Sequence, residues 1–295
     1  MAEIPIIGKQ GQEGFYPVNF WFNPEMENGG AGLVGTPGLT SVVTIVAGSV
    51  ETRGAWDMDG TLYVVCGDTV YTWAGGAVTT CTNTLDTATG RVWMCDNGTQ
   101  VMILAGTKGY YVTGTTVTEI TDVDFPTPCA LAYQDTYSLI IESGTGKLWI
   151  SGINDFSAWD ALDFTTAEAE PDDAISVFSD HREVYVFGSQ SIETYQNTGN
   201  ADFPFERIPG GYIERGCGAA LSVSKGNNYV LWFSDKRQVL RTLGPGQSPG
   251  VPLLRNLTLN FKDIRLFRMP LHGRWTFTAS LGMSYTFHQR IKLGF

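Results

Sequence analysis

A strand–turn–strand–turn–strand pattern recurs six times along the chain and limits its fold more than any other feature. The first turn of each repeat is centred near Gly60, Gly98, Thr136, His181, Asn227 or Gly273. Successive turns lie 38 to 46 residues apart and are rich in Gly, Asn and Asp. A period of about 40 to 50 residues with such hairpin turns is typical of β-propeller blades. The repeats therefore predict an all-β, six-bladed propeller.

The segment between the two turns of a repeat is apolar at consecutive positions. It covers residues 62–65 in the first repeat, 101–104 in the second and 184–187 in the fourth. A half-buried strand alternates apolar with polar residues, whereas a strand covered on both faces reads as a continuous apolar run. Neighbouring blades cover the middle strands of a propeller blade, so these runs favour the propeller.

The two ends of the repeat array predict how the ring closes. The first two repeats continue into a polar, Thr-rich fourth strand at residues 77–81 and 116–120. The sixth repeat lacks such a strand, whereas residues 38–45 look like a fourth strand without a blade. We expect this N-terminal strand to complete the sixth blade, which would remove an open sheet edge. The predicted parts are an irregular segment at residues 1–37 and a single propeller at residues 38–295.

Charge and hydropathy narrow the possible functions. The formal net charge is −11, which argues against a protein that grips DNA phosphates by counterion release. No run of about 18 apolar residues occurs, so we expect no membrane span. The N-terminus has no basic region followed by an apolar stretch, so we expect no signal peptide and synthesis in the cytoplasm.

Residues of the types that bind metals or catalyse reactions are scattered. The five cysteines form no C-x-x-C pair, and their odd number favours buried, reduced thiols over disulfides or a zinc site. Most aspartates fall in the hairpin turns, where a carboxylate accepts local backbone N–H groups. We therefore predict no catalytic residue, no metal and no cofactor. A propeller glycosidase, which needs two carboxylates close together, is the weaker alternative.

Residues 143–147 read Ser-Gly-Thr-Gly-Lys, which are letters found in phosphate-binding loops. A phosphate-binding loop joins a strand to a helix, and its backbone N–H groups surround the anion. This stretch instead lies between two strand patterns, so we expect an ordinary hairpin turn.

Three irregular segments, at residues 1–37, 154–173 and 197–216, carry aromatic side chains. Aromatic residues on loops of a rigid scaffold are frequent interface anchors. The candidate interface residues are Phe20, Trp21, Phe156, Trp159, Phe203, Phe205 and Arg207. The alternative for each of them is that it packs on its own blade.

The stretch from residue 148 to 218 resembles a known family. The matching phrases are NDFSAWDALDFTTAEAEPDD at residues 154–173, VFGSQSIETY at 186–195 and FPFERIPGGYIERG at 203–216. They are similar to the packaged-DNA stabilisation proteins of short-tailed phages, which are tail hub or head-completion proteins. Residues 16–19 and 36–39 fit the same family.

The resemblance implies a structural protein of the virion tail. Such proteins look like rings, here of six copies, that join the portal and adaptor rings to a tail needle and to fibres or spikes. The packaged double-stranded DNA would lie near the ring, and no membrane would be involved. The alternative is a propeller of a phage tail that binds a host receptor or glycan. Oligomeric state separates the two hypotheses.

Overall fold

The structure is a computed structural model that describes residues 41–167, 170–225 and 229–242, together with the backbones of strands β1, β2 and β22–β24. The chain divides into two compact units, Met1–Thr44 and Ile45–Phe295. In the first unit, β1 (Phe20–Asn23) pairs antiparallel with β2 (Gly32–Gly35). Among the described residues, no helix is long and apolar enough to span a membrane.

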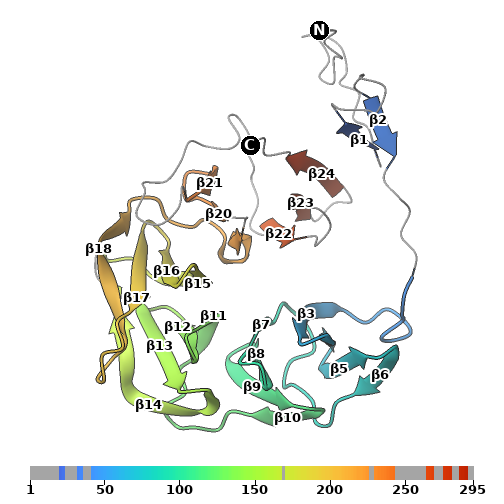
Figure 1. The fold of residues 1–295 in the computed structure, drawn as a ribbon, viewed down its shortest axis with the longest axis horizontal. Helices are drawn as coiled ribbons and strands as arrows, with labels where there is room; N and C mark the ends of the chain where they lie inside the picture. Colours follow the sequence, from blue (N-terminus) through green and yellow to red (C-terminus); the bar gives the residue numbers. More distant parts are fainter. Residues whose placement is uncertain are drawn as a thin grey trace. The chain divides into compact units, whose positions relative to one another are not determined.

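Five antiparallel sheets follow one another in the second unit, each with its strands in chain order (Figure 1). Blade one is β3 (Thr52–Met58), β4 (Thr61–Cys66), β5 (Thr69–Ala74) and β6 (Ala77–Thr80). Blade two is β7 (Trp93–Asp96), β8 (Gln100–Ala105), β9 (Lys108–Thr113) and β10 (Thr116–Glu119). Blade three is β11 (Pro128–Gln134), β12 (Tyr137–Glu142), β13 (Lys147–Gly152) and β14 (Asp155–Thr166). Blade four is β15 (Ala174–Asp180), β16 (Glu183–Gly188), β17 (Ile192–Asn197) and β18 (Phe205–Ile213). The three-stranded blade five follows the short 3₁₀ turn η1 (Ala220–Ser222) and comprises β19 (Ser224–Lys225), β20 (Val230–Phe233) and β21 (Val239–Arg241).

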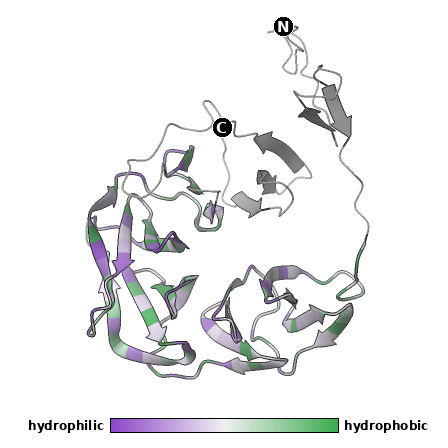
Figure 2. Ribbon diagram, in the orientation of Figure 1, coloured by the Kyte–Doolittle hydropathy of each residue, from purple (hydrophilic) through white to green (hydrophobic). Residues whose placement is uncertain are grey.

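The hydrophobic core lies between successive blades. The first strands β3, β7, β11 and β15 contact one another in that order, and the second strands β4, β8, β12, β16 and β20 are buried along most of their length. Figure 2 shows apolar residues along the strands of these blades. One apolar cluster joins each blade to the next, from blade one through to blade five. The prediction that the middle strands are covered on both faces is confirmed.

The prediction of a six-bladed propeller closed by an N-terminal strand was wrong. The structure shows five blades. Residues 41–50, where the predicted closing strand ends, form no strand, and the side chain of Val42 is 80% exposed. Residues of the sixth repeat pair as a three-stranded sheet of β22 (Ile264–Arg268), β23 (Trp275–Ser280) and β24 (Thr286–Ile291). An alternating sequence forms a strand only where a sheet edge accepts its backbone groups, and sequence patterns do not reveal that edge.

Two of the segments that the sequence predicts to be irregular contain fourth strands. Residues 154–173 include β14, and residues 197–216 include β18. Both strands contain aromatic residues and differ from the short, Thr-rich fourth strands of blades one and two. Blades three and four are therefore complete four-stranded blades.

Polar side chains also join successive blades near the turns between their first two strands. Four contacts make these joints: Trp56 Nε1–Asp96 Oδ2 at 2.6 Å, Asn97 Nδ2–Asn154 O at 3.1 Å, Gln134 Nε2–Arg182 O at 2.9 Å and Lys225 Nζ–Asp180 Oδ1 at 2.5 Å. Each contact links a blade only to its neighbour in the chain. The blades are thus held by apolar clusters with one polar contact or more at each joint.

Candidate protein-interaction site

The outer strand of blade three, β14, departs most from regular pairing. Trp149 pairs with Phe164, and Ser151 pairs with Trp159. Residues 160–163 therefore lie opposite a single residue, Ile150, and form a wide bulge. Bulges on outer strands redirect side chains and mark places where a sheet edge is adapted to a function. This bulge makes the rim of blade three the first candidate for a contact site.

Two predicted interface residues lie beneath the bulge. The side chains of Phe156 and Trp159 are buried, and the indole Nε1 of Trp159 donates to the carbonyl of Phe156 at 3.0 Å. The backbone N–H of Trp159 donates to Asp122 Oδ2 at 3.1 Å, and its ring lies edge-on to Phe125 with centroids 5.1 Å apart. Tyr133 packs edge-on against Phe156 at 6.1 Å. These two rings fix β14 on blades two and three. Their role in an interface stays a prediction.

Three large apolar side chains around β14 are exposed instead. Leu162 in the bulge is 81% exposed, Ile153 in the turn before β14 is 67% exposed, and Val123 is 92% exposed. Val123 follows Asp122, the residue that binds the Trp159 backbone. They are three of the five exposed large hydrophobic residues in the described part of the chain. Sequence reasoning missed them because a single aliphatic residue in a polar segment gives no periodic signal.

Aspartates lie close to these apolar residues in the sequence. They are Asp122, Asp124, Asp155, Asp160 and Asp163, and residues 121–127 and 152–166 contain no Lys or Arg. Burial, followed by the charge of Asp160, raises the pKa of Asp163. We call Val123, Ile153 and Leu162 with these five aspartates the β14 surface. It combines exposed apolar side chains with five acidic residues from segments that contain no Lys or Arg.

A second candidate site is a cavity of about 600 Å³ between blades three and four. Its lining residues are Thr165, Thr166, Glu193, Tyr195, Phe203, Phe205, Glu206 and Arg207. Arg207 Nη1 lies 3.6 Å from Glu193 Oε2, and the Tyr195 hydroxyl donates to the same oxygen at 3.0 Å. The structure thus brings together the predicted residues Phe203, Phe205 and Arg207. It adds Glu193 and Tyr195, which belong to the Ile-Glu-Thr-Tyr phrase of the family resemblance.

The predicted residues in this cavity differ in exposure. Phe205 is 1% exposed and packs edge-on against Tyr137 with centroids 5.8 Å apart. Phe203 is partly buried against Phe205, and half of the Arg207 side chain is exposed. Phe203 and Arg207 are therefore the residues that another molecule could reach. Phe20 and Trp21 lie on β1, where only the backbone is described, so their side chains lie outside the described residues.

The phrases that carry the family resemblance meet at one turn of blade four. Asp172 Oδ2 accepts the backbone N–H groups of Gln190 and Ser191 at 2.6 and 3.1 Å. A Cβ on Gly188 would lie 2.3 Å from the same carboxylate oxygen, and one on Gly216 would lie 2.2 Å from the carbonyl oxygen of Ser189. Both glycines therefore permit a close approach that a side chain would block. These residues build the turn of the blade.

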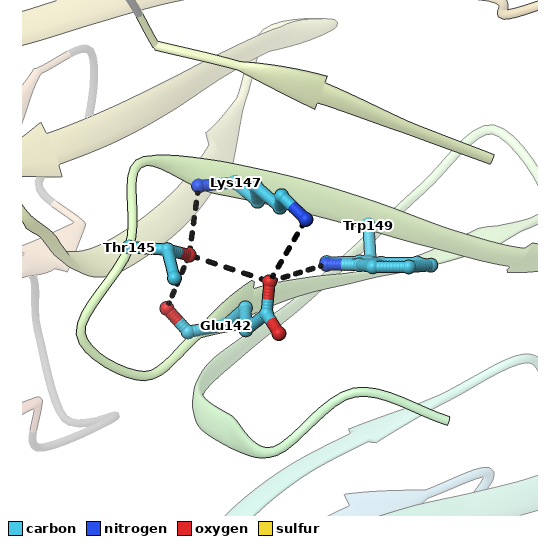
Figure 3. A network of polar contacts seen from close by, with 4 residues as sticks. All are labelled: Glu142, Thr145, Lys147 and Trp149. Atoms are coloured by element: carbon cyan, nitrogen blue, oxygen red, sulfur yellow. Dashed lines mark hydrogen bonds and ion pairs between the residues drawn. The ribbon is translucent and has the colours of Figure 1, made fainter. Parts of the chain in front are cut away.

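Residues 143–147 form the turn between β12 and β13, as predicted (Figure 3). Thr145 Oγ1 donates to the carbonyl of Glu142 at 3.1 Å, and Trp149 Nε1 donates to Glu142 Oε2 at 3.2 Å. Lys147 Nζ lies 3.7 Å from the same carboxylate oxygen and 4.3 Å from the ring centroid of Phe164. A carboxylate at the centre of this turn repels anions, so the turn is not a phosphate site.

Among the titratable side chains of the described residues are buried thiols and carboxylates that bond to local backbone groups. All five cysteines are free, and burial raises the pKa of Cys81, Cys129 and Cys217 to about 11, so these thiols stay protonated at neutral pH. The Asp96 carboxylate accepts the backbone N–H of Gly98 at 2.8 Å, which is the turn role expected from the sequence. Across residues 41–167, 170–225 and 229–242, no three His, Cys, Asp or Glu side chains group as metal ligands would.

The sequence matches the phage stabilisation family described as "Bacteriophage P22 Gp10, beta-propeller" over residues 3–243. This match covers all five blades and most of the chain. The chain belongs to this family. It is accordingly a phage structural protein with a β-propeller fold and a component of the virion. The family resemblance seen in residues 148–218 is confirmed at this level.

Solved structures share the fold of this phage stabilisation protein, whereas no curated protein sequence matches it. The extracellular domain of the one component system BT4673 from B. thetaiotaomicron gives a TM-score of 0.54 at 9% identity, over 81% of this chain and 33% of that one. The quinonprotein alcohol dehydrogenase-like protein BT1487 from the same organism gives 0.53 at 11% identity, over 78% and 60%. The Cps50 (Swd1) β-propeller domain of Myceliophteria thermophila gives 0.51 at 13% identity, over 77% and 80%. The chain thus spans about a third of the first structure and less than two thirds of the second. At these identities the likeness shows the fold alone.

Proposed function

We propose that this protein is a component of the phage tail hub. Six copies form a ring that docks on the portal–adaptor ring, joins it to the tail needle and to fibres or spikes, and retains the packaged DNA in the virion. The protein is made in the host cytoplasm and assembles into the tail. The observation that supports this most is the match to the phage stabilisation family across all five blades.

The distribution of charge supports a role beside DNA that does not involve holding it. Residues 41–242 contain 25 Asp and Glu against 11 Lys and Arg, a net charge of −14. A protein binds DNA more tightly with each phosphate that it neutralises, and an acidic surface neutralises none. The blades therefore suit a ring that DNA passes without being bound.

The mass of the purified protein, alone and mixed with the adaptor–portal complex, tests this function. We expect light scattering to show six copies recruited to the complex. A monomer that ignores the complex at all concentrations would overturn the hub assignment. The matched control is the adaptor–portal complex with an unrelated propeller of similar mass.

The cavity between blades three and four favours a second candidate function, the binding of a glycan. Its lining offers carboxylates as acceptors, the Arg207 guanidinium as a donor, two Thr hydroxyls and a partly exposed ring at Phe203. Sugar hydroxyls are both donors and acceptors, so they would satisfy such a mixed lining without adding charge.

An array of bacterial surface glycans separates this candidate from a role as an interface. Binding that Arg207→Met and Phe203→Ala each weaken at least tenfold would support a glycan site. If no glycan binds the unaltered protein, while the same two variants fail to dock on the adaptor–portal complex, the cavity is an interface with a protein.

A further inference from the structure

We propose that the β14 surface is a contact between copies of this chain, and that it receives the basic residues 243–295 of a second copy. This inference rests on the ring described under the proposed function and names the surfaces that would hold it together. Three features of the molecule lead to it: an exposed apolar group on a rigid support, a local excess of negative charge, and a basic segment in the same chain.

The apolar part of the surface is held in place before any partner binds. Leu162 lies in the β14 bulge, and Trp159, three residues before it, is anchored by Asp122 and Phe125. The buried ring of Phe156 fixes the start of the same strand. An exposed side chain on a fixed backbone loses little conformational freedom when a partner covers it. The bulge therefore presents Leu162 as an anchor for a contact.

The negative charge of the β14 surface requires a partner with positive charge. Five aspartates and no Lys or Arg occur in residues 121–127 and 152–166. Burial, and after it the charge of Asp160, raises the pKa of Asp163, and a nearby cation would relieve the repulsion between the two carboxylates. A partner for this surface should combine apolar residues with Lys or Arg.

Only one part of a second copy has that chemistry. Residues 41–242 of the second copy carry a net charge of −14 and would be repelled. Residues 243–295 contain seven Lys and Arg and one Asp, among many Leu, Phe, Ile and Val residues. When two complementary patches lie at different places on one chain, copies can associate head to tail, and the contact closes into a ring where the rotation between copies allows it. The division of charge within this chain suits such a contact.

Paired charge reversals test the contact. We expect Asp160→Lys with Asp163→Lys to weaken ring formation on the adaptor–portal complex at least tenfold, as measured by light scattering. Arg255→Glu with Lys262→Glu should weaken it similarly. The four substitutions in one chain should restore the ring, because the two reversed pairs of charges then attract each other again. Asp202→Lys with Glu214→Lys makes the same change of charge on exposed residues of blade four and should leave the ring intact.

A separate variant tests the apolar part of the β14 surface, because charge reversals at the bulge could also disturb folding. Leu162→Ser removes an exposed side chain, so its thermal unfolding should match that of the unaltered protein while ring formation falls. If the ring survives both Leu162→Ser and the reversal at Asp160 and Asp163, the contact does not exist.

Two further outcomes are distinguishable. If the reversal at Asp160 and Asp163 leaves six copies associated but abolishes docking on the adaptor, then another protein covers the β14 surface and the second copy does not. If the unaltered chain forms no ring with or without the adaptor–portal complex, the proposed hub function itself fails, and this contact fails with it.

Discussion

Blades one and two differ from blades three and four at their outer strands, although their inner strands are buried in the same way. The outer strands β6 and β10 are four residues long, and β6 is mostly exposed. Strands β14 and β18 are 12 and nine residues long, with shifts of register against their neighbours. Short polar edges discourage pairing with other chains, whereas long irregular edges carry additional surface. The comparison separates two blades with short, regular outer strands from two blades with long, irregular outer strands that carry additional surface.

The largest expected effect concerns the support of the β14 bulge. Trp159→Ala removes a buried ring and should lower the free energy of unfolding by about 3–5 kcal/mol. Leu162→Ala at the exposed surface should change it by less than about 0.5 kcal/mol. Urea denaturation of both variants measures the difference. Equal losses of unfolding free energy in the two variants would mean that the bulge is packed throughout, and the contrast between blades one and two and blades three and four would fail.

The close approach of Gly216 to the turn of blade four should give the next largest effect. Gly216→Ala would place a Cβ 2.2 Å from the carbonyl oxygen of Ser189, so backbone must move, at a cost of about 3 kcal/mol. Gly199→Ala is the control: no atom lies within 4 Å, and only its positive φ of 72° should cost about 1 kcal/mol. The urea concentrations at half-unfolding rank the two variants. A smaller loss of stability in Gly216→Ala than in Gly199→Ala would contradict this account of blade four.

Arg53 provides the corresponding test in blade one. Its buried guanidinium donates to the carbonyls of Gly90 and Gly67 at 2.6 and 2.9 Å, and to the carbonyl and hydroxyl of Thr87. Arg53→Met leaves these carbonyls without their donor and should cost about 2 kcal/mol. Arg53→Lys keeps one charged donor and should lose less. Thermal unfolding of both variants checks this, and equal stability of all three proteins would show that the contacts do not stabilise blade one.

Asp163 in the β14 bulge should give the smallest effect and one that depends on pH. Burial raises its pKa in the folded state, so its protonated form is favoured there, and the stability it contributes is lost as pH rises through that pKa. Asp163→Asn should therefore raise stability at neutral pH by a few tenths of a kcal/mol, since exposure to solvent screens the effect. The gain should vanish near pH 3, where most Asp side chains are protonated. Thermal unfolding across this pH range measures it, and a gain that persists at low pH would have another cause.

Features with a local cause were predictable from the sequence. The turns near Gly60, Gly98, Thr136 and His181 each join the first two strands of a blade, because hairpin turns depend on a few adjacent residues. The apolar runs became buried strands for a similar reason, since burial on both faces needs no alternation. The family resemblance also depended on short phrases, which the match over residues 3–243 confirms.

Features that depend on distant partners were not predictable. The aromatic residues Phe156 and Trp159 are candidate interface anchors by sequence, but Asp122 and Phe125 of the preceding connection hold Trp159 inside, and Tyr133 packs against Phe156. Residues 38–45 are predicted to be a closing strand because they look like a fourth strand and the sixth repeat lacks one, whereas the sheet edge that would accept them is not encoded locally. Glu193, in the cavity between blades three and four, likewise stands out only once the structure places Arg207 and Tyr195 beside it.

The contacts between successive blades determine which parts of this protein unfold together. Each polar contact between turns, such as Trp56–Asp96 or Lys225–Asp180, connects a blade only with the next one along the chain. In repeat proteins with contacts of this kind, cooperativity is limited to neighbouring units, and units can open separately. Amide hydrogen exchange should therefore resolve the blades into distinct groups of rates, with the second strands slowest in each group. A virion protein of this design could yield at one joint under mechanical load while the remaining blades stay folded.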